Sequence, residues 1–369
     1  MKLLRVLFYV CLIALVQACS SGKSAYKHGD YYDAVISAAQ RLRQSPDNKK
    51  SKEVLSLSYQ AAVNYLETDA QNQINSGANF KWKSAVQNYE KINTLYEQIR
   101  TSPGALKIVP NPVSKYKELT EVKAKAAEES YEAGIQAMLK NTRDDSKQAF
   151  FFFSDANQFS PGYREAIEMI TKSKFDATLK VVVQPSIQNM YDWNFNPQIF
   201  GYKGNQFVQF YTPVQAQEQS LAKIDQFMTL VVNGFQEARP AVTKRVQDVR
   251  DSVKTGEQTI NGKKVPVYKP VTAQMTIYEK KITSRGSIRV LVVDAQSKAE
   301  VKNSEIVSDM GWSDTWATYT GDAKALSQSN LALCQKKEPY MTRDYLVKQT
   351  ESDLARKLSS ALVAFYQSY

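Results

Sequence analysis

The stretch KQAFFFFSDANQFSPGYREAIEMI, residues 147–170, decides the fold of the amino-terminal half. Ala149, Phe153 and Ala156 are spaced by four and three residues, and Pro161 follows. Residues at this spacing share one face of an α-helix, and small side chains on that face let a second helix approach closely. Proline ends a helix because it has no N–H to donate. The stretch therefore predicts two antiparallel helices joined at the proline.

The four consecutive phenylalanines in this stretch have two interpretations. Exposed together, they would form a hydrophobic docking patch. On a helix, however, Phe150 and Phe153 point one way while Phe151 and Phe152 point elsewhere. We therefore expect both faces to be buried between neighbouring helices.

Similar spacing occurs earlier in the chain, in residues 27–48 and 51–67 and again in residues 80–99. In the first of these Gly29-Asp30-Tyr31 predicts a turn between helices, and in the last the helix is expected to run on to Arg100, before Pro103. This pattern resembles the tetratricopeptide (TPR) repeat. The resemblance implies an array of antiparallel helix pairs that binds other proteins and carries out no chemistry of its own. The residues expected to pack the repeats are Leu55, Tyr59, Ala85, Tyr89, Ala149, Phe153, Ala156 and Pro161.

The carboxy-terminal half has mixed patterns. The run LKVVVQP and the segments 271–282 and 286–306 predict strands, the last segment being a pair that turns near Asp294 to Ser297. Residues 220–236 and 342–369 carry apolar residues at helical intervals. Asn261-Gly262 predicts a hairpin turn between short strands, and Pro266 and Pro270 would confine the second strand to a sheet edge. We therefore predict an α+β chain: a TPR-like helical array, then a mixed α+β domain of helix on sheet.

Aspartates and tryptophans cluster in DMGWSDTWATYTGDAKALS, residues 309–327. One interpretation is a carbohydrate or peptide groove, in which indole rings stack on the ligand and carboxylates accept hydrogen bonds; paired carboxylates would also suit a hydrolase. The other is that the tryptophans hold a loop against the sheet while the last aspartate caps a helix. We favour packing. The candidate groove residues are Asp309, Trp312, Asp314, Trp316 and Asp322.

The amino terminus predicts an export signal. Lys2 and Arg5 precede an apolar run, residues 6–16, that is too short to span a membrane. The run ends in VQAC, which resembles the lipobox of bacterial lipoproteins. The resemblance implies cleavage before Cys19 and attachment of diacylglycerol and an N-acyl chain to it. A plain secretory signal with a chance cysteine is the alternative. With no acidic residue directly after Cys19, we expect an outer membrane location facing the periplasm.

Other functional classes find little support in the composition. His28 is the only histidine, so a Ser-His-Asp triad or a histidine-rich metal site elsewhere is excluded. Cys334 is expected to be a buried small hydrophobe. The net charge of +11 comes from scattered basic groups without a nucleic-acid-binding motif, which argues against nucleic acid as a partner. The basic groups form either a solvated surface or one that contacts anionic envelope polymers or lipid head groups. We expect no cofactor and no catalysis.

These observations divide the chain into a signal peptide (1–18), a lipidated tether (19–26), a TPR-like domain (27–175) and an α+β domain (176–369) that ends in an amphipathic helix. The favoured function is a membrane-anchored scaffold or assembly factor that binds envelope proteins through its repeats. The alternative is a periplasmic or surface carbohydrate- or peptide-binding protein, or a hydrolase, that uses the aspartates and tryptophans.

Overall fold

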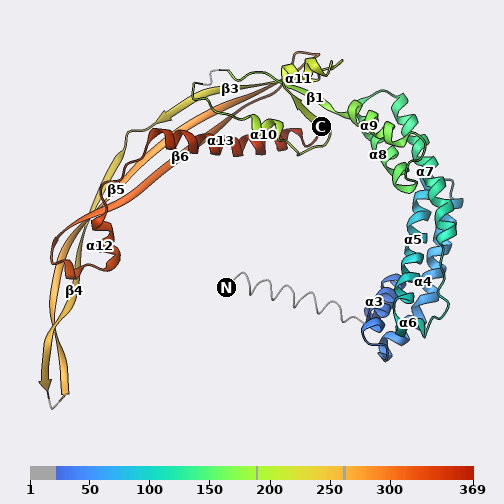
Figure 1. Cartoon of the computed structure of the whole chain (residues 1–369), viewed down its shortest axis with the longest axis horizontal. Helices are drawn as coiled ribbons and strands as arrows, with labels where there is room; N and C mark the ends of the chain where they lie inside the picture. The colour runs from blue at the N-terminus through green and yellow to red at the C-terminus, as the bar shows by residue number, and fades with distance from the viewer. Residues whose placement is uncertain (1–21, 188–189, 261–262) are drawn as a thin grey trace. The chain divides into compact units, whose positions relative to one another are not determined.

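The computed structural model describes residues 22–187, 190–260 and 263–369. The described chain is mixed α+β, as predicted, and divides into two compact units. The helical unit ends at Ala177, and the sheet unit begins at Thr178. Figure 1 labels the elements of both units.

In the helical unit each long helix packs against the next long helix along the chain. Side-chain caps begin several helices: Asn48 accepts the N–H of Ser51 at 3.0 Å, and Thr142 accepts that of Asp145 at 3.1 Å. These caps satisfy N–H groups that have no partner within the helix. The helices are α2 Lys23–Lys27, α3 Tyr31–Gln44, α4 Lys49–Asn75, α5 Lys81–Arg100, α6 Pro103–Leu106, α7 Tyr116–Leu139, α8 Arg143–Phe159 and α9 Ala166–Ala177.

The consecutive phenylalanines of α8 differ in burial. Phe153 is fully buried against Tyr131, with ring centroids 5.4 Å apart, and a Cβ on Gly134 would lie 2.6 Å from the Phe153 ring. Glycine at that position therefore lets α7 and α8 approach. Phe152 stacks on Phe80 at 5.1 Å. Phe151 is 51% exposed, so the expectation that both faces are buried was wrong for this residue, which lies on the solvent side of α8.

The sheet unit contains one six-stranded sheet in the order β2-β1-β3-β5-β4, with β6 also paired to β5. β1 runs parallel to β2 and β3, and the other pairs are antiparallel. β4 pairs with residues 263–281 of β5 and β3 pairs with residues 284–294, so the two strands occupy successive parts of β5. β6 pairs with most of the length of β5. The strands are β1 Leu179–Val183, β2 Val208–Tyr211, β3 Gln226–Glu237, β4 Ala241–Ile260, β5 Lys263–Asp294 and β6 Glu300–Gly321.

The helix predicted over residues 220–236 was wrong, because most of this segment forms strand β3. Its buried residues alternate with less buried ones, with Met228, Leu230 and Val232 on the inner face. A short apolar run fits either period, and here the neighbouring strands β1 and β5 supply the hydrogen bonds. The other helices of this unit are α10 Asn196–Phe200, α11 Pro213–Glu218, the 3₁₀ helix η1 Ala323–Ala325, α12 Gln328–Gln335 and α13 Arg343–Tyr366.

The face of β5 that is buried changes along its length. From Ile282 to Val292 the even-numbered residues are buried in the core that includes α13. From Ala273 to Ile277 the odd-numbered residues are buried instead, in a cluster with residues of η1 and α12. Successive side chains of a strand point to opposite faces, so these two covers lie on opposite faces of the β5–β6 ribbon.

The hairpin around Asn261-Gly262 is much longer than predicted. β4 has 20 residues and β5 has 32, whereas the turn itself lies outside the described residues. We call residues 241–260 and 263–272 the arm. β4 is exposed along almost its whole length, and Figure 1 shows the arm running beyond α12. Pro266 and Pro270 lie in the part of β5 that pairs with β4 but not with β6.

Candidate peptide-binding groove

The residues predicted to pack the repeats occupy the interior of the helical unit. Leu55, Tyr59, Ala85, Tyr89, Ala149, Phe153 and Ala156 are all buried, and Pro161 is exposed just after α8. The phenolic oxygen of Tyr59 accepts the N–H of Val113 at 2.6 Å, and that of Tyr89 accepts Nε2 of Gln71 at 2.9 Å. Burial raises the pKa of both tyrosines. The predicted lipidation site, Cys19, lies outside the described residues.

The aspartate and tryptophan cluster lies on strand β6, so the predicted loop is a strand. By strand alternation Trp312, Asp314 and Trp316 share one face and Asp309 points to the other. Asp322, directly after the strand, caps η1 by accepting the N–H of Lys324 at 2.9 Å. The five residues are therefore divided between the two faces and the end of β6.

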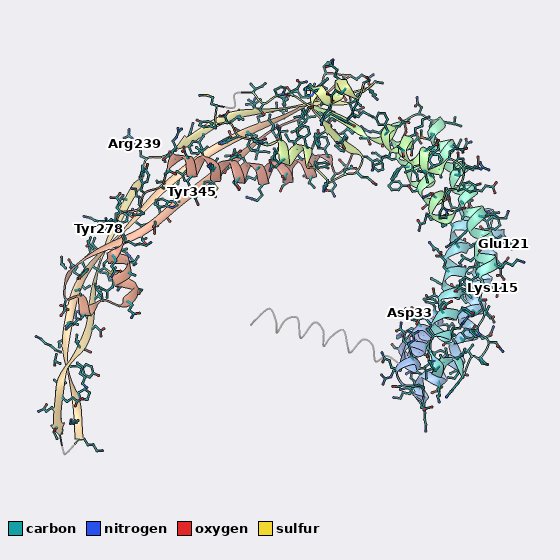
Figure 2. The ribbon with its side chains drawn as sticks, viewed as in Figure 1. Asp33, Lys115, Glu121, Arg239, Tyr278 and Tyr345 are labelled. Atoms are coloured by element: carbon teal, nitrogen blue, oxygen red, sulfur yellow. The ribbon has the colours of Figure 1, made fainter. Side chains whose placement is uncertain are left out.

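Four of these side chains have partners within the fold. Trp316 stacks on Tyr278, which is labelled in Figure 2, with ring centroids 5.2 Å apart, and Trp312 packs against the core that includes α13. Lys336 donates to Asp314 at 2.9 Å and holds the pKa of that carboxyl below its ordinary value. Arg285 lies 3.6 Å from Asp309. These contacts within the fold favour the packing interpretation of the cluster over a ligand groove.

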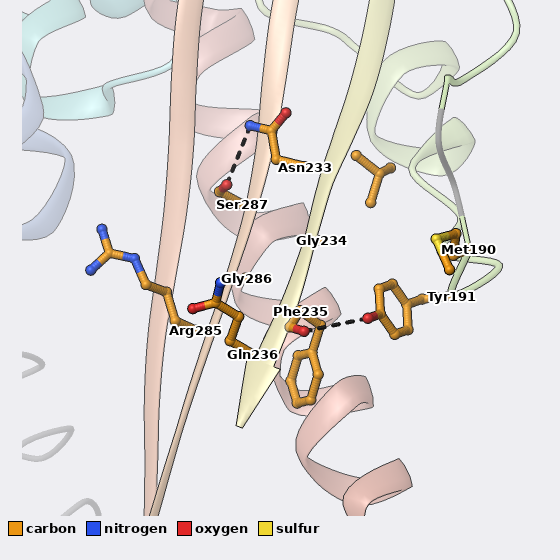
Figure 3. A pocket seen from close by; sticks show the side chains of 10 residues that line it. Met190, Tyr191, Asn233, Gly234, Phe235, Gln236, Arg285, Gly286 and Ser287 are labelled. Atoms are coloured by element: carbon orange, nitrogen blue, oxygen red, sulfur yellow. Dashed lines mark hydrogen bonds between the residues drawn. The ribbon is translucent and has the colours of Figure 1, made fainter. Parts of the chain in front are cut away.

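A pocket with both apolar and polar lining lies where β3 bulges, at Gly234, whose φ of 130° suits glycine (Figure 3). The pocket measures about 630 Å³. Beside it Asn233 donates to Glu305 at 2.9 Å and Ser287 donates to the same carboxylate at 2.7 Å. The hydrogen bonds from Ser287 and Asn233 lower the pKa of Glu305. The arrangement ties three strands together at the bulge.

A second cavity, of about 570 Å³, opens on the surface of the helical unit, and we call it the groove. The start of α3 forms one wall. Gly29 has a φ of 80°, which permits the turn before α3, and Asp30 caps the helix by accepting the N–H of Asp33 at 3.1 Å. The remaining walls come from α4 and α5, so three helices meet at the groove.

The groove has an apolar floor and an aromatic rim. Ala62 and Leu66, one turn apart on α4, are 2% and 3% exposed and form the floor. Tyr65 stands between them in sequence but is 69% exposed, and Tyr31 is 37% exposed. Tyrosine presents a rigid apolar ring together with a hydroxyl, which suits contact with both apolar and polar groups of a ligand.

Charges of both signs line the groove. The carboxylates of Asp30 and Asp33 come from the start of α3 (Asp33 is labelled in Figure 2), and the ammonium of Lys91 comes from α5. Lys91 Nζ lies 5.6 Å from the centre of the Tyr32 ring, within cation–π range. Burial raises the pKa of Tyr32. A ligand with an apolar centre and separate charged groups fits this lining.

Sequence reasoning missed the groove. The Gly29-Asp30-Tyr31 turn indicated a helix boundary, but nothing in a single stretch of sequence showed that Tyr65 and Lys91 approach it. The available signal was Tyr65 placed between the apolar Ala62 and Leu66 of one predicted helix, and only the structure shows that Tyr65 is exposed while its two neighbours are buried.

Comparison with known proteins adds no relative: no family model matches the chain, and no curated protein matches it significantly. Within residues 22–187, 190–260 and 263–369, no helix is both long and apolar enough to cross a membrane. The same residues contain no cluster of three or more histidine, cysteine or acidic side chains arranged to hold a metal ion.

Proposed function

We propose that this protein is a membrane-anchored envelope lipoprotein that acts as a protein-binding scaffold or assembly factor, and that its helical unit binds an extended segment of a partner protein in the groove. The observation that carries this proposal is the groove itself, with its buried apolar floor and exposed Tyr65. Exposed tyrosine beside an apolar floor is typical of protein interfaces. The sequential packing of α3 to α9 is compatible with a TPR-like array.

The groove is tested by recovering partners from detergent-solubilised envelope after photo-crosslinking to the full-length protein. Tyr65→Ala and Lys91→Glu should each reduce crosslinked partner at least about tenfold, the loss expected for an interface hot spot. The matched control is Leu57→Ala, because Leu57 is 51% exposed on the same helix and lies outside the groove. Equal recovery with wild-type protein and both groove variants would contradict the proposal. Melting temperatures should agree, since Tyr65 and Lys91 are exposed.

The anchor is supported by the leader, which ends in Val16-Gln17-Ala18-Cys19. Two or three acyl chains on Cys19 would anchor the protein stably, whereas one chain alone binds a bilayer only reversibly. The expected location is the outer membrane, facing the periplasm. Radiolabelled palmitate should enter the wild-type protein and not the Cys19→Ala variant, which should also keep its signal peptide. A normally processed, membrane-held Cys19→Ala protein would contradict lipidation.

A further inference from the structure

The apolar face of β5 continues into the arm beyond its helical cover. Ala273, Met275 and Ile277 are buried in the cluster with residues of η1 and α12. Two-residue periodicity places Val267 and Val265 on the same face. These valines are 41% and 42% exposed, so the row of apolar residues on this face, which we call the apolar stripe, extends beyond the elements that cover it.

The arm is also basic. Its described residues include seven lysines and arginines against three acidic residues. One of the three, Glu257, is held by Lys254 at 2.7 Å and lies 4.0 Å from Lys264. Lys263 and Lys269 share the face of the exposed valines and have no ion-pair partner within the described part of the chain. Lys263 and Lys269 therefore flank Val265 and Val267 of the apolar stripe, and the one acidic residue of the arm on this face, Asp251, lies opposite Val271.

Strand addition to the free edge of β5 in the arm is blocked. The carbonyl of Thr272 accepts the N–H of Asp322 at 3.0 Å, so Thr272 faces the β6 side. By alternation Pro270 and Pro266 face the same side. Neither has an N–H to offer an incoming strand. A binding partner on this side would contact the side-chain face of the arm and not its backbone edge.

We propose that this face of the arm binds a lipid bilayer with anionic headgroups, the valines entering the interface and Lys263 and Lys269 lying among the phosphates. An amphipathic element with lysines around its apolar face is suited to such a surface. A second copy packed face to face would bring the same lysines of both copies together, which charge repulsion disfavours. The proposal concerns the sheet unit and does not depend on the groove.

The test is hydrogen exchange of full-length protein with vesicles of phosphatidylcholine alone or mixed equally with phosphatidylglycerol. A two-stranded ribbon is marginally stable by itself, so its amides should exchange quickly until a surface holds it. Peptides covering residues 252–260 and 263–272 should exchange at least about tenfold more slowly with phosphatidylglycerol than with phosphatidylcholine alone. Any lipid anchor is the same in both samples, so the difference reports on the arm.

Two charge variants complete the test. Lys263→Glu combined with Lys269→Glu should abolish the slowing, whereas Lys337→Glu combined with Lys348→Glu, the same charge change at exposed positions outside the arm, should retain it. Equal exchange in both vesicles, or slowing that survives the arm variant, overturns the proposal. If amide exchange in the arm slows in the absence of vesicles, and slows further as the protein concentration rises, the proposal is overturned and the arm binds a second copy of the chain.

Discussion

Strand β5 passes through two environments, and the contrast between them shows what stabilises this sheet. In the arm β5 pairs with β4 alone and its side chains are mostly exposed. From Ile282 to Val292 it pairs with β6 and, from Ser284 onward, with β3, under α13. The inner part has two hydrogen-bonded neighbours and the arm has one, but each hydrogen bond adds only modestly to stability because it replaces one to water. The larger difference is the apolar area that a covering helix removes from water.

The largest effect on stability is expected from removing a buried side chain of α13, the helix that covers the inner part of β5. Leu358 of α13 is fully buried in that core. Leu358→Ala should lower the free energy of unfolding of the sheet unit by about 3 kcal/mol, from lost burial and the remaining cavity. Urea titration followed by tryptophan fluorescence measures the loss.

The matched change in the arm is Val267→Ala, at a side chain that is 41% exposed. It should lower the free energy of unfolding by less than about 0.5 kcal/mol. A similar loss of unfolding free energy in both variants would show that the arm contributes to stability as much as the part of β5 under α13.

An acid titration sharpens the comparison through the attachment of α13 to β6. Partial burial would raise the pKa of Asp353, but its ion pairs with Lys357 and Arg356 outweigh burial and lower the pKa from 3.8 to about 2. Lys357 also donates to the carbonyl of Val307 on β6 at 2.8 Å. Because the folded pKa is the lower one, this stabilisation is present above about pH 4 and is lost as the pH falls toward 2.

Asp353→Asn should therefore cost roughly 1 to 2 kcal/mol at pH 7 and almost nothing near pH 2. Urea titrations of both proteins at several pH values measure the difference. A constant difference across this range would mean that the carboxylate charge makes no contribution.

At the prolines of the arm we expect a change in association and little change in stability. Pro266→Val together with Pro270→Val should change the free energy of unfolding by less than about 0.5 kcal/mol, yet it restores two N–H groups on a free edge and should promote association. Light scattering at increasing protein concentration measures this. The control is Val265→Ile with Val267→Ile, which adds apolar bulk at positions whose N–H groups face β4. Association of the control alone would contradict the role of the prolines.

Local patterns predicted much of the secondary structure. The helix from Arg143 to Phe159, the end of α5 at Arg100 and the long final helix follow from apolar spacing and end signals within a few residues. The turn between β5 and β6 was also predicted, and there the Asp294 carboxylate accepts the N–H of Ser297 at 2.7 Å. Patterns failed over residues 220–236, where a short apolar run fits a helix or a strand equally well.

By itself the sequence determined that the described chain is mixed α+β, roughly where several long helices begin and end, and which of their residues are apolar. The long helix α7 was not predicted. Only the tertiary structure decided which face of β5 is buried, because that depends on where α12 and α13 return to the sheet after leaving it. It also decided that Tyr65 and Lys91 meet the start of α3 in one groove. Spacing within a segment is a local property, whereas burial and grooves arise where distant segments pack together.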